Sequence, residues 1–531
     1  MKILLTTLNS KYSHINISLY YLKENLANIC DVSLKNFTIN DNLDNILDKI
    51  IQCNSDIVCF GCYIWNIEQT LKICDNLKRL KPDITIVLGG PEVSYNSKFL
   101  LSNHSFLSCI ICGEAEVSIV KLVEDFNTNN LQKIYNIPVN VEDIPCIADN
   151  ILNNYDNRVV YFETSRGCPY RCSYCLSCID KNIKYFDMLK VQKELLILLK
   201  KNVKQIRFID RTFNSNKKRA IKLWDFLLNN RIDTTFHFEI CASLIDEETI
   251  SFLSNIPKDV FQFEIGIQST NESTLVAINR NYNWNFEKSI LNSLRKNNNI
   301  TLHTDLIIGL PYENLDIFKS SFNELYKVNS HEIQLGFLKF LKGTTLYENK
   351  DKYNYIYNAY PPYEILQNSF LSYNDVRFLK QFEIIFDSIY NTHYYNISIN
   401  FLSLKYTSPF DMYEDITKYF LKNGLLDRKI SIDEIFEKLI YMYKDEEYIS
   451  TLRQCLTYDY FIKFKGTREW FFNKYLENKK TLLNKFVEKN RQTLFFDMNN
   501  NDIYKKYKFT ILDIDIKTYE QKEAKIYYTE K

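Results

Sequence analysis

One short segment decides the fold assignment of this chain of 531 residues. Residues 163–175 read Glu-Thr-Ser-Arg-Gly-Cys-Pro-Tyr-Arg-Cys-Ser-Tyr-Cys and overlap the end of an apolar strand predicted at Val159 to Thr164. Three and two residues separate Cys168, Cys172 and Cys175, so one loop can bring all three thiolates round one metal cluster. Most iron–sulfur clusters take four such soft ligands. Three ligands therefore leave one iron open to a substrate or a cofactor.

Two other interpretations of these cysteines stay open. The loop could hold zinc, which prefers four ligands, or the three cysteines could be buried simply as small apolar side chains. Cys178 lies three residues past Cys175 and could complete a four-thiolate site. The residues after Cys178 lack the proline-bearing pattern of bacterial ferredoxins, so we treat it as a neighbour of the site.

Strands and helices alternate along the segment that contains this motif. The expected strands are Val159 to Thr164, Gln205 to Asp210, Thr235 to Ile240, Phe261 to Ile267, Thr301 to Ile308 and Glu332 to Phe340. Helical patterns such as Met188 to Lys201 and Lys217 to Asn229 separate them. Six strand–helix repeats predict an α/β fold in the form of a partial (β/α)6 barrel, whose active face lies at the carboxyl ends of the strands.

A second alternation occupies residues 1 to about 135 and predicts a Rossmann-like, flavodoxin-like parallel sheet. Its expected strands are Ile3 to Leu8, Asp31 to Phe37, Asp56 to Tyr63, Thr85 to Leu88 and Cys109 to Cys112. Ligands of such sheets bind beyond the carboxyl ends of the strands. Two of these ends carry glycine turns, Gly89-Gly90-Pro91-Glu92 and Gly113-Glu114-Ala115-Glu116.

These patterns predict four segments. We expect a Rossmann-like domain at 1–135, a polar linker with Pro138 and Pro145 at 136–157, the barrel at 158–346 and a mainly helical domain at 347–531. The last segment is rich in Tyr and Phe, and one further strand is expected there, at Phe509 to Ile516.

Composition limits the partners and the compartment. Lys plus Arg number 66 and Asp plus Glu 65, so no global field draws the chain to nucleic acid, which we do not expect to bind. No apolar run approaches the length of a membrane span. The N-terminus shows no secretory signal, so we expect a cytoplasmic protein whose 14 cysteines stay reduced and serve metal binding or catalysis before disulfides.

The Cys-x-x-x-Cys-x-x-Cys loop at the top of a first barrel strand resembles that of the radical S-adenosylmethionine (SAM) superfamily. The resemblance implies that Cys168, Cys172 and Cys175 hold a 4Fe-4S cluster and that SAM chelates its open iron. One electron then cleaves SAM to a 5′-deoxyadenosyl radical, and an electron donor of flavodoxin or ferredoxin type is implied. Tyr174 would lie beside the adenine.

Further SAM contacts are expected at the other strand ends. By resemblance, Asp210 would accept a hydrogen bond from the SAM amino group, although a helix-capping role suits it equally well. Ile307 and Gly309 resemble the fifth-strand segment against the adenine. Glu239 and Glu264 lie in strongly apolar strands, with Gln268 at the end of the second. Buried acids are costly unless paired, so a lumen that holds a polar cofactor explains them better than a dry core.

A Rossmann-like domain before such a barrel resembles the cobalamin-binding subclass. The glycine turns then correspond to loops round the corrinoid, which gives Gly89, Gly90, Pro91, Glu92, Gly113 and Glu114 as contacts, with Tyr63 as a wall of the lower face. The Asp-x-His-x-x-Gly motif that supplies an axial histidine in many cobalamin proteins is absent. His14 is the only early histidine, and a structural role suits it better. A domain that keeps the fold without cobalamin is the alternative.

The expected function is that of a cobalamin-dependent radical SAM enzyme that acts on a small-molecule or unknown substrate by methyl transfer, rearrangement or cyclisation. The first alternative is a tRNA methylthiotransferase-like enzyme, whose second cluster would draw on N-terminal cysteines such as Cys59, Cys62 and Cys112. The second is a non-enzymatic iron–sulfur electron carrier or redox sensor on an inert barrel.

Overall fold

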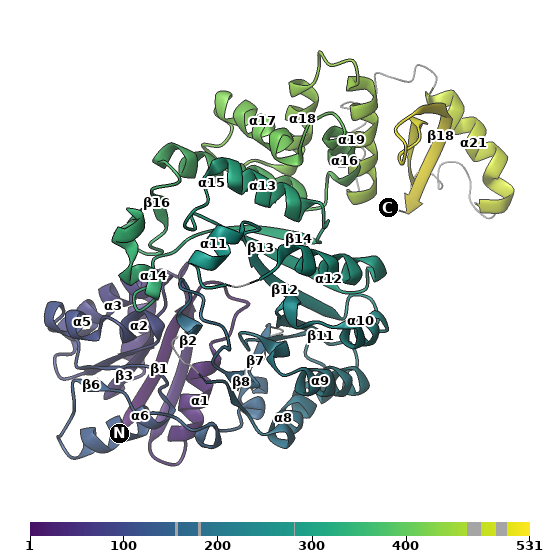
Figure 1. Cartoon of the computed structure of the whole chain (residues 1–531). Coiled ribbons are helices and arrows are strands. Elements are labelled where there is room, and N and C mark those ends of the chain that lie inside the picture. The colour runs from purple at the N-terminus through teal and green to yellow at the C-terminus, as the bar shows by residue number, and fades with distance from the viewer. Residues whose placement is uncertain are drawn as a thin grey trace. The chain divides into compact units, whose positions relative to one another are not determined.

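The computed structural model describes residues 1–153, 155, 158–178, 182–280, 282–464, 479–494 and 507–530. The chain divides into two compact units, Met1–Val376 and Arg377–Lys531. The first unit contains both predicted parallel sheets, shown from purple to teal in Figure 1. No helix in the described ranges combines the length and apolar character needed to cross a lipid bilayer.

The N-terminal sheet has six strands in the order β2-β1-β3-β4-β5-β6, and every ladder is parallel. The strands are β1 Lys2–Asn9, β2 Asp31–Thr38, β3 Ile57–Gly61, β4 Thr85–Gly89, β5 Cys109–Ile111 and β6 Ile134–Tyr135. The strand order reverses at β1, which places the ligand crevice between β1 and β3. The five predicted strands are confirmed; β6 was not predicted because two residues carry no periodicity.

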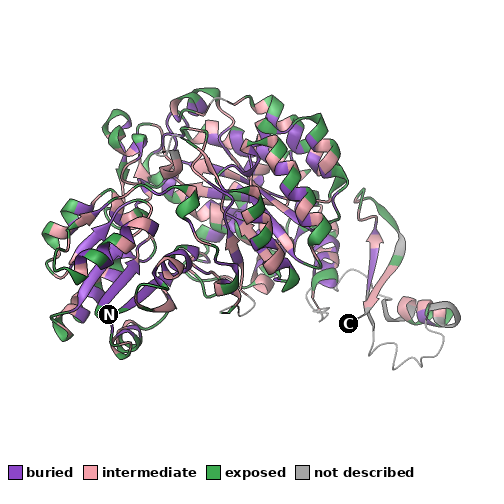
Figure 2. Ribbon diagram, turned by 90° about the horizontal axis from the view of Figure 1, so that it is seen from below, coloured by how far each residue is buried: buried purple, intermediate pink, exposed green. Residues whose placement is uncertain are grey.

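Helices cover both faces of this sheet: α1 Ile17–Leu26, α2 Leu43–Gln52, α3 Ile67–Leu80, α4 Pro91–Ser94, α5 Ser97–Asn103 and α6 Glu116–Asn127. Each face buries its own apolar cluster, one against α2, α3 and α5 and the other against α1 and α6. The central strands β1, β3, β4 and β5 are almost wholly buried, as Figure 2 shows in purple. This packing leaves the carboxyl ends of the strands free for a ligand.

The second sheet has the order β14-β13-β12-β11-β10-β7 and is parallel throughout. The strands are β7 Val160–Phe162, β10 Gln205–Phe208, β11 Thr235–Glu239, β12 Phe261–Gln268, β13 Thr301–Ile308 and β14 Glu332–Phe337. Strands adjacent in this order follow one another along the chain as strand–helix repeats, which confirms the predicted partial barrel. A short ladder of β8 Ser165–Arg166 with β9 Lys184–Tyr185 flanks the cysteine loop.

The helices of the barrel are α8 Met188–Lys200, α9 Lys217–Asn230, α10 Glu247–Ser254, α11 Glu272–Ala277, α12 Trp284–Asn297 and α13 Leu315–Tyr326, with α7 Ala148–Leu152 before them and α14 Thr345–Glu348 after them. Aromatic rings fill the space between α9 and the sheet. Trp224 is fully buried against Phe238, Phe261 and Phe263. Burial of each such side chain stabilises the fold by about 1.5–3 kcal/mol. This packing holds α9 against the strands whose carboxyl ends carry the site residues.

The second unit is mainly helical, as expected. It contains α16 Asn396–Ser403, α17 Pro409–Lys422, α18 Ile432–Met442, α19 Ile449–Lys463 and α21 Lys479–Leu494, while α15 Tyr373–Phe386 spans the boundary between the units. The buried carboxylate of Asp459 accepts hydrogen bonds from the backbone amides of Ile397 and Ser398 and so caps α16. The predicted last strand is β17 Tyr507–Ile514, and it pairs with an antiparallel strand that was not predicted, β18 Gln521–Glu530.

Candidate functional site

The cysteine loop leaves the sheet directly after β7 and β8. Gly167 has φ +89°, and a Cβ there would lie 2.6 Å from the carbonyl oxygen of Asn182, so a glycine is required before Cys168. Burial raises the pKa of the Cys168 thiol, and the nearby Cys172 and Cys175 raise it further. The loop therefore brings the three thiols into one neighbourhood in which binding of a positive cluster would offset their mutual repulsion.

The segment after α11 holds this loop in place. The Ser173 amide donates a hydrogen bond to the Ile278 carbonyl at 2.9 Å, and the Asn279 side chain donates one to the Arg171 carbonyl at 2.8 Å. The Leu346 amide, in α14, donates to the Ser173 carbonyl at 2.7 Å. Backbone bonds on both sides of Cys172 therefore fix the direction of its thiol.

Arg280 is a site residue that the sequence analysis missed. Its Nη1 lies 3.8 Å from Cys172 Sγ and 3.2 Å from the hydroxyl of Tyr174, and its Nη2 donates to the Gly266 carbonyl. The guanidinium also lies 4.6 Å from the centre of the Tyr282 ring. The available signal was an arginine in a polar Asn-Arg-Asn segment beyond a strand end. Its positive charge stabilises a thiolate at Cys172.

The donor set of this loop fits an iron–sulfur cluster. Among the cysteines whose side chains are described, Cys168 and Cys175 are half-buried and Cys172 is buried. No three His, Cys, Asp or Glu side chains in the described ranges gather closely enough to hold one metal ion. The ligands of a cluster bind separate irons, so they need a wider spacing than the ligands of one ion.

Two polar atoms at the upper end of the lumen fit a polar ligand. Gln268 Oε1 and Asp305 Oδ1 are buried, and neither has a hydrogen-bond partner among the described residues. Gln268 has φ +70° at an irregularity in the pairing of β12 with β13, which turns it out of the regular strand. A buried polar atom without a partner is costly, so a bound ligand with complementary groups would be stabilised here. Asp305 was not predicted.

Glu239 and Glu264, the two predicted lumen acids, have different surroundings. Glu239 lies 3.7 Å from Arg211 Nη1, and burial raises the pKa of its carboxyl to about 7. Glu264 lies 3.2 Å from His237 Nε2, and this hydrogen bond lowers its pKa. The two acids are register partners on β11 and β12, so they lie at the same level of the lumen, each beside a side chain that the protein supplies.

Ile307 and Gly309, predicted to face the adenine, lie at the carboxyl end of β13. Gly309 has φ +99°, and its carbonyl accepts hydrogen bonds from the Tyr355 hydroxyl at 2.9 Å and the Asn368 amide at 3.0 Å. These bonds fix the backbone of the turn but use its carbonyl group.

Asp210 is fully engaged within the protein. Its carboxylate accepts hydrogen bonds from the Thr164 amide at 2.9 Å, the Thr164 hydroxyl at 2.7 Å and the Ser165 hydroxyl at 2.6 Å. These bonds join the end of β10 to the backbone that leads into the cysteine loop. The structure thus offers a positioning role for Asp210, and its contact with SAM stays a prediction.

Replacement of this carboxylate tests the positioning role. Asp210→Ala should lower the free energy of unfolding by about 3 kcal/mol, because three buried donors lose a charged acceptor. Urea unfolding followed by circular dichroism measures the change, and Asp75→Ala, which removes an exposed partner of Arg79, is the control. Unchanged stability together with weakened SAM binding would instead favour the predicted contact with SAM.

The predicted cobalamin loops border a cavity of about 380 Å³. It is lined by Tyr63, Gly89, Gly90, Pro91, Gly113 and Glu114, together with apolar residues of α1, β3 and α6 and with Leu176 and Ile209 of the barrel. Tyr63 accepts a hydrogen bond from the Asn16 side chain at 2.9 Å and stacks on Trp65 with ring centres 4.6 Å apart. Six of the seven predicted cobalamin residues thus lie round one apolar space, a chemistry that fits a corrin ring.

Glu92 and His14 lie apart from this cavity wall. Glu92 accepts a hydrogen bond from the Tyr363 hydroxyl at 2.7 Å, so it joins the β4 loop to a hairpin that follows the barrel. His14 Nδ1 lies 3.1 Å from the hydroxyl of Tyr161. None of the described residues that line the cavity is a histidine.

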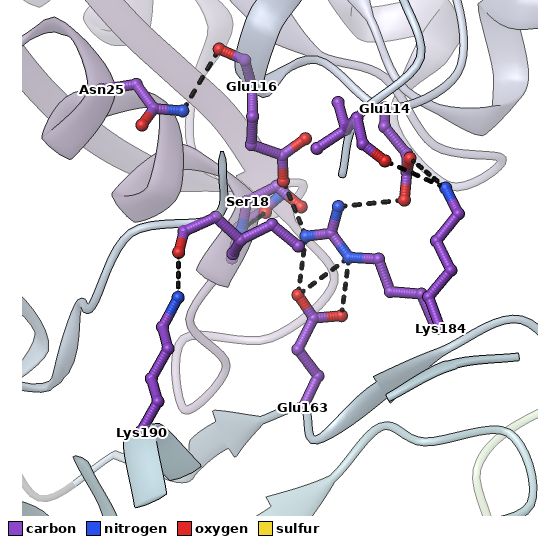
Figure 3. Close-up of polar contacts among 11 residues, drawn as sticks. Ser18, Asn25, Glu114, Glu116, Glu163, Lys184 and Lys190 are labelled. Carbon is purple, nitrogen blue, oxygen red and sulfur yellow. Dashed lines mark hydrogen bonds and ion pairs between the residues drawn. The ribbon is translucent and has the colours of Figure 1, made fainter. Parts of the chain in front are cut away.

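A second cavity of about 670 Å³ adjoins the first and reaches the cysteine loop at Ser165 and Gly167. Both cavities border on Glu114, Glu163 and Arg166. Figure 3 shows Glu114, Glu116 and Glu163 converging from different elements on this wall. The loop that carries the thiols and the loops that surround the apolar cavity are therefore neighbours.

Comparison with protein-family models gives three consecutive matches. A model described as B12 binding domain matches residues 3–123, and one described as Radical SAM superfamily matches residues 162–325. A third, described as Protein of unknown function (DUF4080), matches residues 351–529. The matches follow the two sheets and the C-terminal region described above.

Two curated methyltransferases are similar to this chain over about half of its length. The cobalamin-dependent radical SAM methyltransferase TokK of Streptomyces tokunonensis is 23% identical over 339 residues, which are 55% of this chain and 47% of TokK. The 2-(S-pantetheinyl)-carbapenam-3-carboxylate methyltransferase of Streptantibioticus cattleyicolor is 23% identical over 326 residues, 52% of this chain and 46% of the relative. The chain spans about half the length of these two proteins.

A solved structure shares the fold over most of the chain. The cobalamin-dependent SAM radical enzyme OxsB, with aqua-cobalamin and SAM bound, superposes with a TM-score of 0.60 at 16% identity and covers 94% of this chain and 82% of OxsB. The three family matches show that this chain carries a radical SAM domain, preceded by a B12-binding domain and followed by a DUF4080 region.

Proposed function

We propose that this protein is a cobalamin-dependent radical SAM enzyme, with methyl transfer as its favoured reaction. The observation that carries the proposal is the juxtaposition of three cysteines on one loop with an apolar cavity bordered by glycine turns. When bound, the 4Fe-4S cluster supplies the electron that cleaves SAM, and cobalamin supplies a transferable methyl group.

The chain's own residues have defined tasks in this scheme. Cys168, Cys172 and Cys175 would hold the cluster, and Arg280 would help to position Cys172 through the contact of 3.8 Å. Gln268 and Asp305 would bind polar groups of SAM, because their buried oxygens have no described partner. Glu239, Glu264 and Tyr174 lie next to this region, whereas Ile307 and Gly309 would shape the lumen beside it.

Tyr63, Gly89, Gly90, Pro91, Gly113 and Glu114 would surround cobalamin. Tyr63, which stacks on Trp65, would lie against the bound cobalamin. Apolar walls exclude water from a radical and so suppress side reactions. We expect the enzyme to act in the cytoplasm with a flavodoxin-type or ferredoxin-type donor, and to have its domain boundaries near residues 135, 157 and 346.

A second cluster of the methylthiotransferase type has less support. Cys59 packs into the apolar cluster on the α1 and α6 face of the sheet, whereas Cys62 and Cys112 pack into the cluster on the opposite face. Burial also raises the thiol pKa of Cys59 and Cys62 far above the ordinary value. These thiols behave as small apolar core residues.

A cofactor assay tests the proposal. Full-length protein reconstituted anaerobically with iron and sulfide, then mixed with SAM and dithionite, should form 5′-deoxyadenosine, because the open iron lets SAM approach the cluster. Protein produced with cobalamin should also show the visible band of a bound corrinoid. An intact cluster without 5′-deoxyadenosine would contradict the enzyme, and about eight irons per chain in place of about four would favour the methylthiotransferase alternative.

A further inference from the structure

A buried ion-pair network joins the two halves of the first unit at Arg166. The guanidinium donates to Glu163 at 2.7 Å, to Glu116 at 2.6 Å and to Glu114 at 3.1 Å. Lys184 donates to the other oxygen of Glu114 at 3.0 Å. The side chains of Arg166, Glu116 and Glu163 are 15%, 6% and 9% exposed. Solvent therefore screens these pairs far less than pairs on the surface.

The network connects the two loops that the proposed function assigns to different cofactors. Glu114 lies in the turn that follows β5, and Glu116 is the first residue of α6; that turn borders the proposed cobalamin cavity. Arg166 ends β8 and lies two residues before Cys168. In Figure 3 the carboxylates of Glu114, Glu116 and Glu163 surround one guanidinium group. One guanidinium thus contacts both loops.

The geometry demands an arginine. Nε and Nη2 form a fork on Glu163, Nη1 points to Glu114, and Nη2 also bonds Glu116. A planar guanidinium offers five donors in fixed directions, whereas a lysine ammonium is a compact charge without this fork. Lysine at position 166 would keep the charge but could not join three carboxylates in these directions. Such a substitution separates the geometry of the network from its charge.

We propose that Arg166 is a positioning residue that couples the cysteine loop to the cobalamin loop, so that ordering of either loop favours ordering of the other. This inference rests on the proposed function for the identity of the two ligands. The coupling is reciprocal. A bound cluster increases the affinity for cobalamin by the same factor by which bound cobalamin increases the affinity for the cluster. Through it, Arg166 sets the placement of the two cofactors relative to each other.

Hydrogen exchange in the full-length, cluster-reconstituted protein tests the coupling without cobalamin. Arg166→Lys should speed exchange of the amides of residues 113–119 by at least about tenfold, although the substitution lies on the other loop. Glu116→Gln should in turn speed exchange of the amides of residues 167–175. The proposal is wrong if each variant loosens only its own loop. Glu116→Gln removes one charge and keeps the size of the side chain. It therefore still tests the coupling if Arg166→Lys folds poorly.

A matched surface pair supplies the control. Arg79 also forms a fork on a carboxylate, that of Asp75, with bonds of 3.0 and 2.9 Å, but its side chain is 73% exposed. Arg79→Lys should leave exchange in both loops unchanged. If it loosened them as much as Arg166→Lys does, the effect would reflect general destabilisation, and the proposal would fall.

Cobalamin affinity provides the second readout, measured by equilibrium dialysis with hydroxocobalamin. Cluster-loaded protein should bind at least about tenfold more tightly than protein without the cluster, and Arg166→Lys should bring this ratio close to one. An unchanged ratio in the variant would overturn the coupling. If the wild-type protein bound no cobalamin while each variant still loosened the opposite loop, the cofactor assignment would fail and the coupling would stand.

Discussion

Cys172→Ala is expected to lower the iron content of the reconstituted protein from about four to less than about one per chain and to abolish 5′-deoxyadenosine formation. Two ligands on one loop cannot hold the cluster against loss of iron to solvent. Cys172 is also the most buried of the three thiols and the one that Arg280 contacts, so no neighbouring water replaces it easily. Iron analysis and visible absorbance measure the loss of the cluster, and product chromatography measures the loss of 5′-deoxyadenosine.

Cys146→Ser is the matched control, because Cys146 is an exposed thiol that lies before the barrel strands. It should retain full iron and full activity. A Cys172→Ala protein that keeps four irons would contradict the ligand assignment. Loss of iron in the control as well would show that reconstitution depends on thiols in general.

The cluster motif could be predicted because its information is local. The spacing of Cys168, Cys172 and Cys175 and the strand before them lie within about twenty residues, and Gly167 indicates the tight backbone that the loop needs. Parallel strands were predictable for a similar reason, since each buried strand is a continuous apolar run. β6 and β18 escaped detection because one has two residues and the other is a polar edge strand.

The partners of the charged residues could not be predicted. Sequence predicted Glu114 and Glu92 as cofactor contacts because both follow strand ends, but Glu114 binds Arg166 and Lys184, and Glu92 binds Tyr363, which is 271 residues away. Arg280 meets the cysteine loop from 108 residues away. Such pairs form where strands and loops from distant parts of the chain meet, and a local sequence pattern does not indicate which segments meet.

The lumen illustrates both outcomes. Its polarity was predictable from acids inside apolar strands, since a buried charge needs a partner or a ligand. The identity of the partner was not: Glu264 faces His237 on the neighbouring strand, and Asp210 ties down Thr164 and Ser165. Gln268 Oε1 and Asp305 Oδ1 are buried oxygens without a described partner, so we expect both to contact SAM.

The glycine turn after β4 gives the second large expected effect. Gly90→Ala should lower the free energy of unfolding by about 3 kcal/mol and weaken cobalamin binding by at least about tenfold. Gly90 has φ +108° and ψ 174°, a region open essentially to glycine alone. A Cβ there would also lie 2.5 Å from the carbonyl oxygen of Cys62. The turn must therefore shift, and with it the wall of the cavity.

Gly89→Ala is the matched control one residue earlier. The nearest atoms to a Cβ at position 89 lie 3.7 and 3.8 Å away, an ordinary contact distance, so stability should change by less than about 1 kcal/mol. Urea unfolding and equilibrium dialysis with hydroxocobalamin measure both variants. If both variants bound hydroxocobalamin equally well, the turn at Gly90 would not form part of the cobalamin site. Because the two variants add the same methyl group to adjacent residues, a difference in stability between them reflects the backbone conformation of Gly90 and its close approach to Cys62.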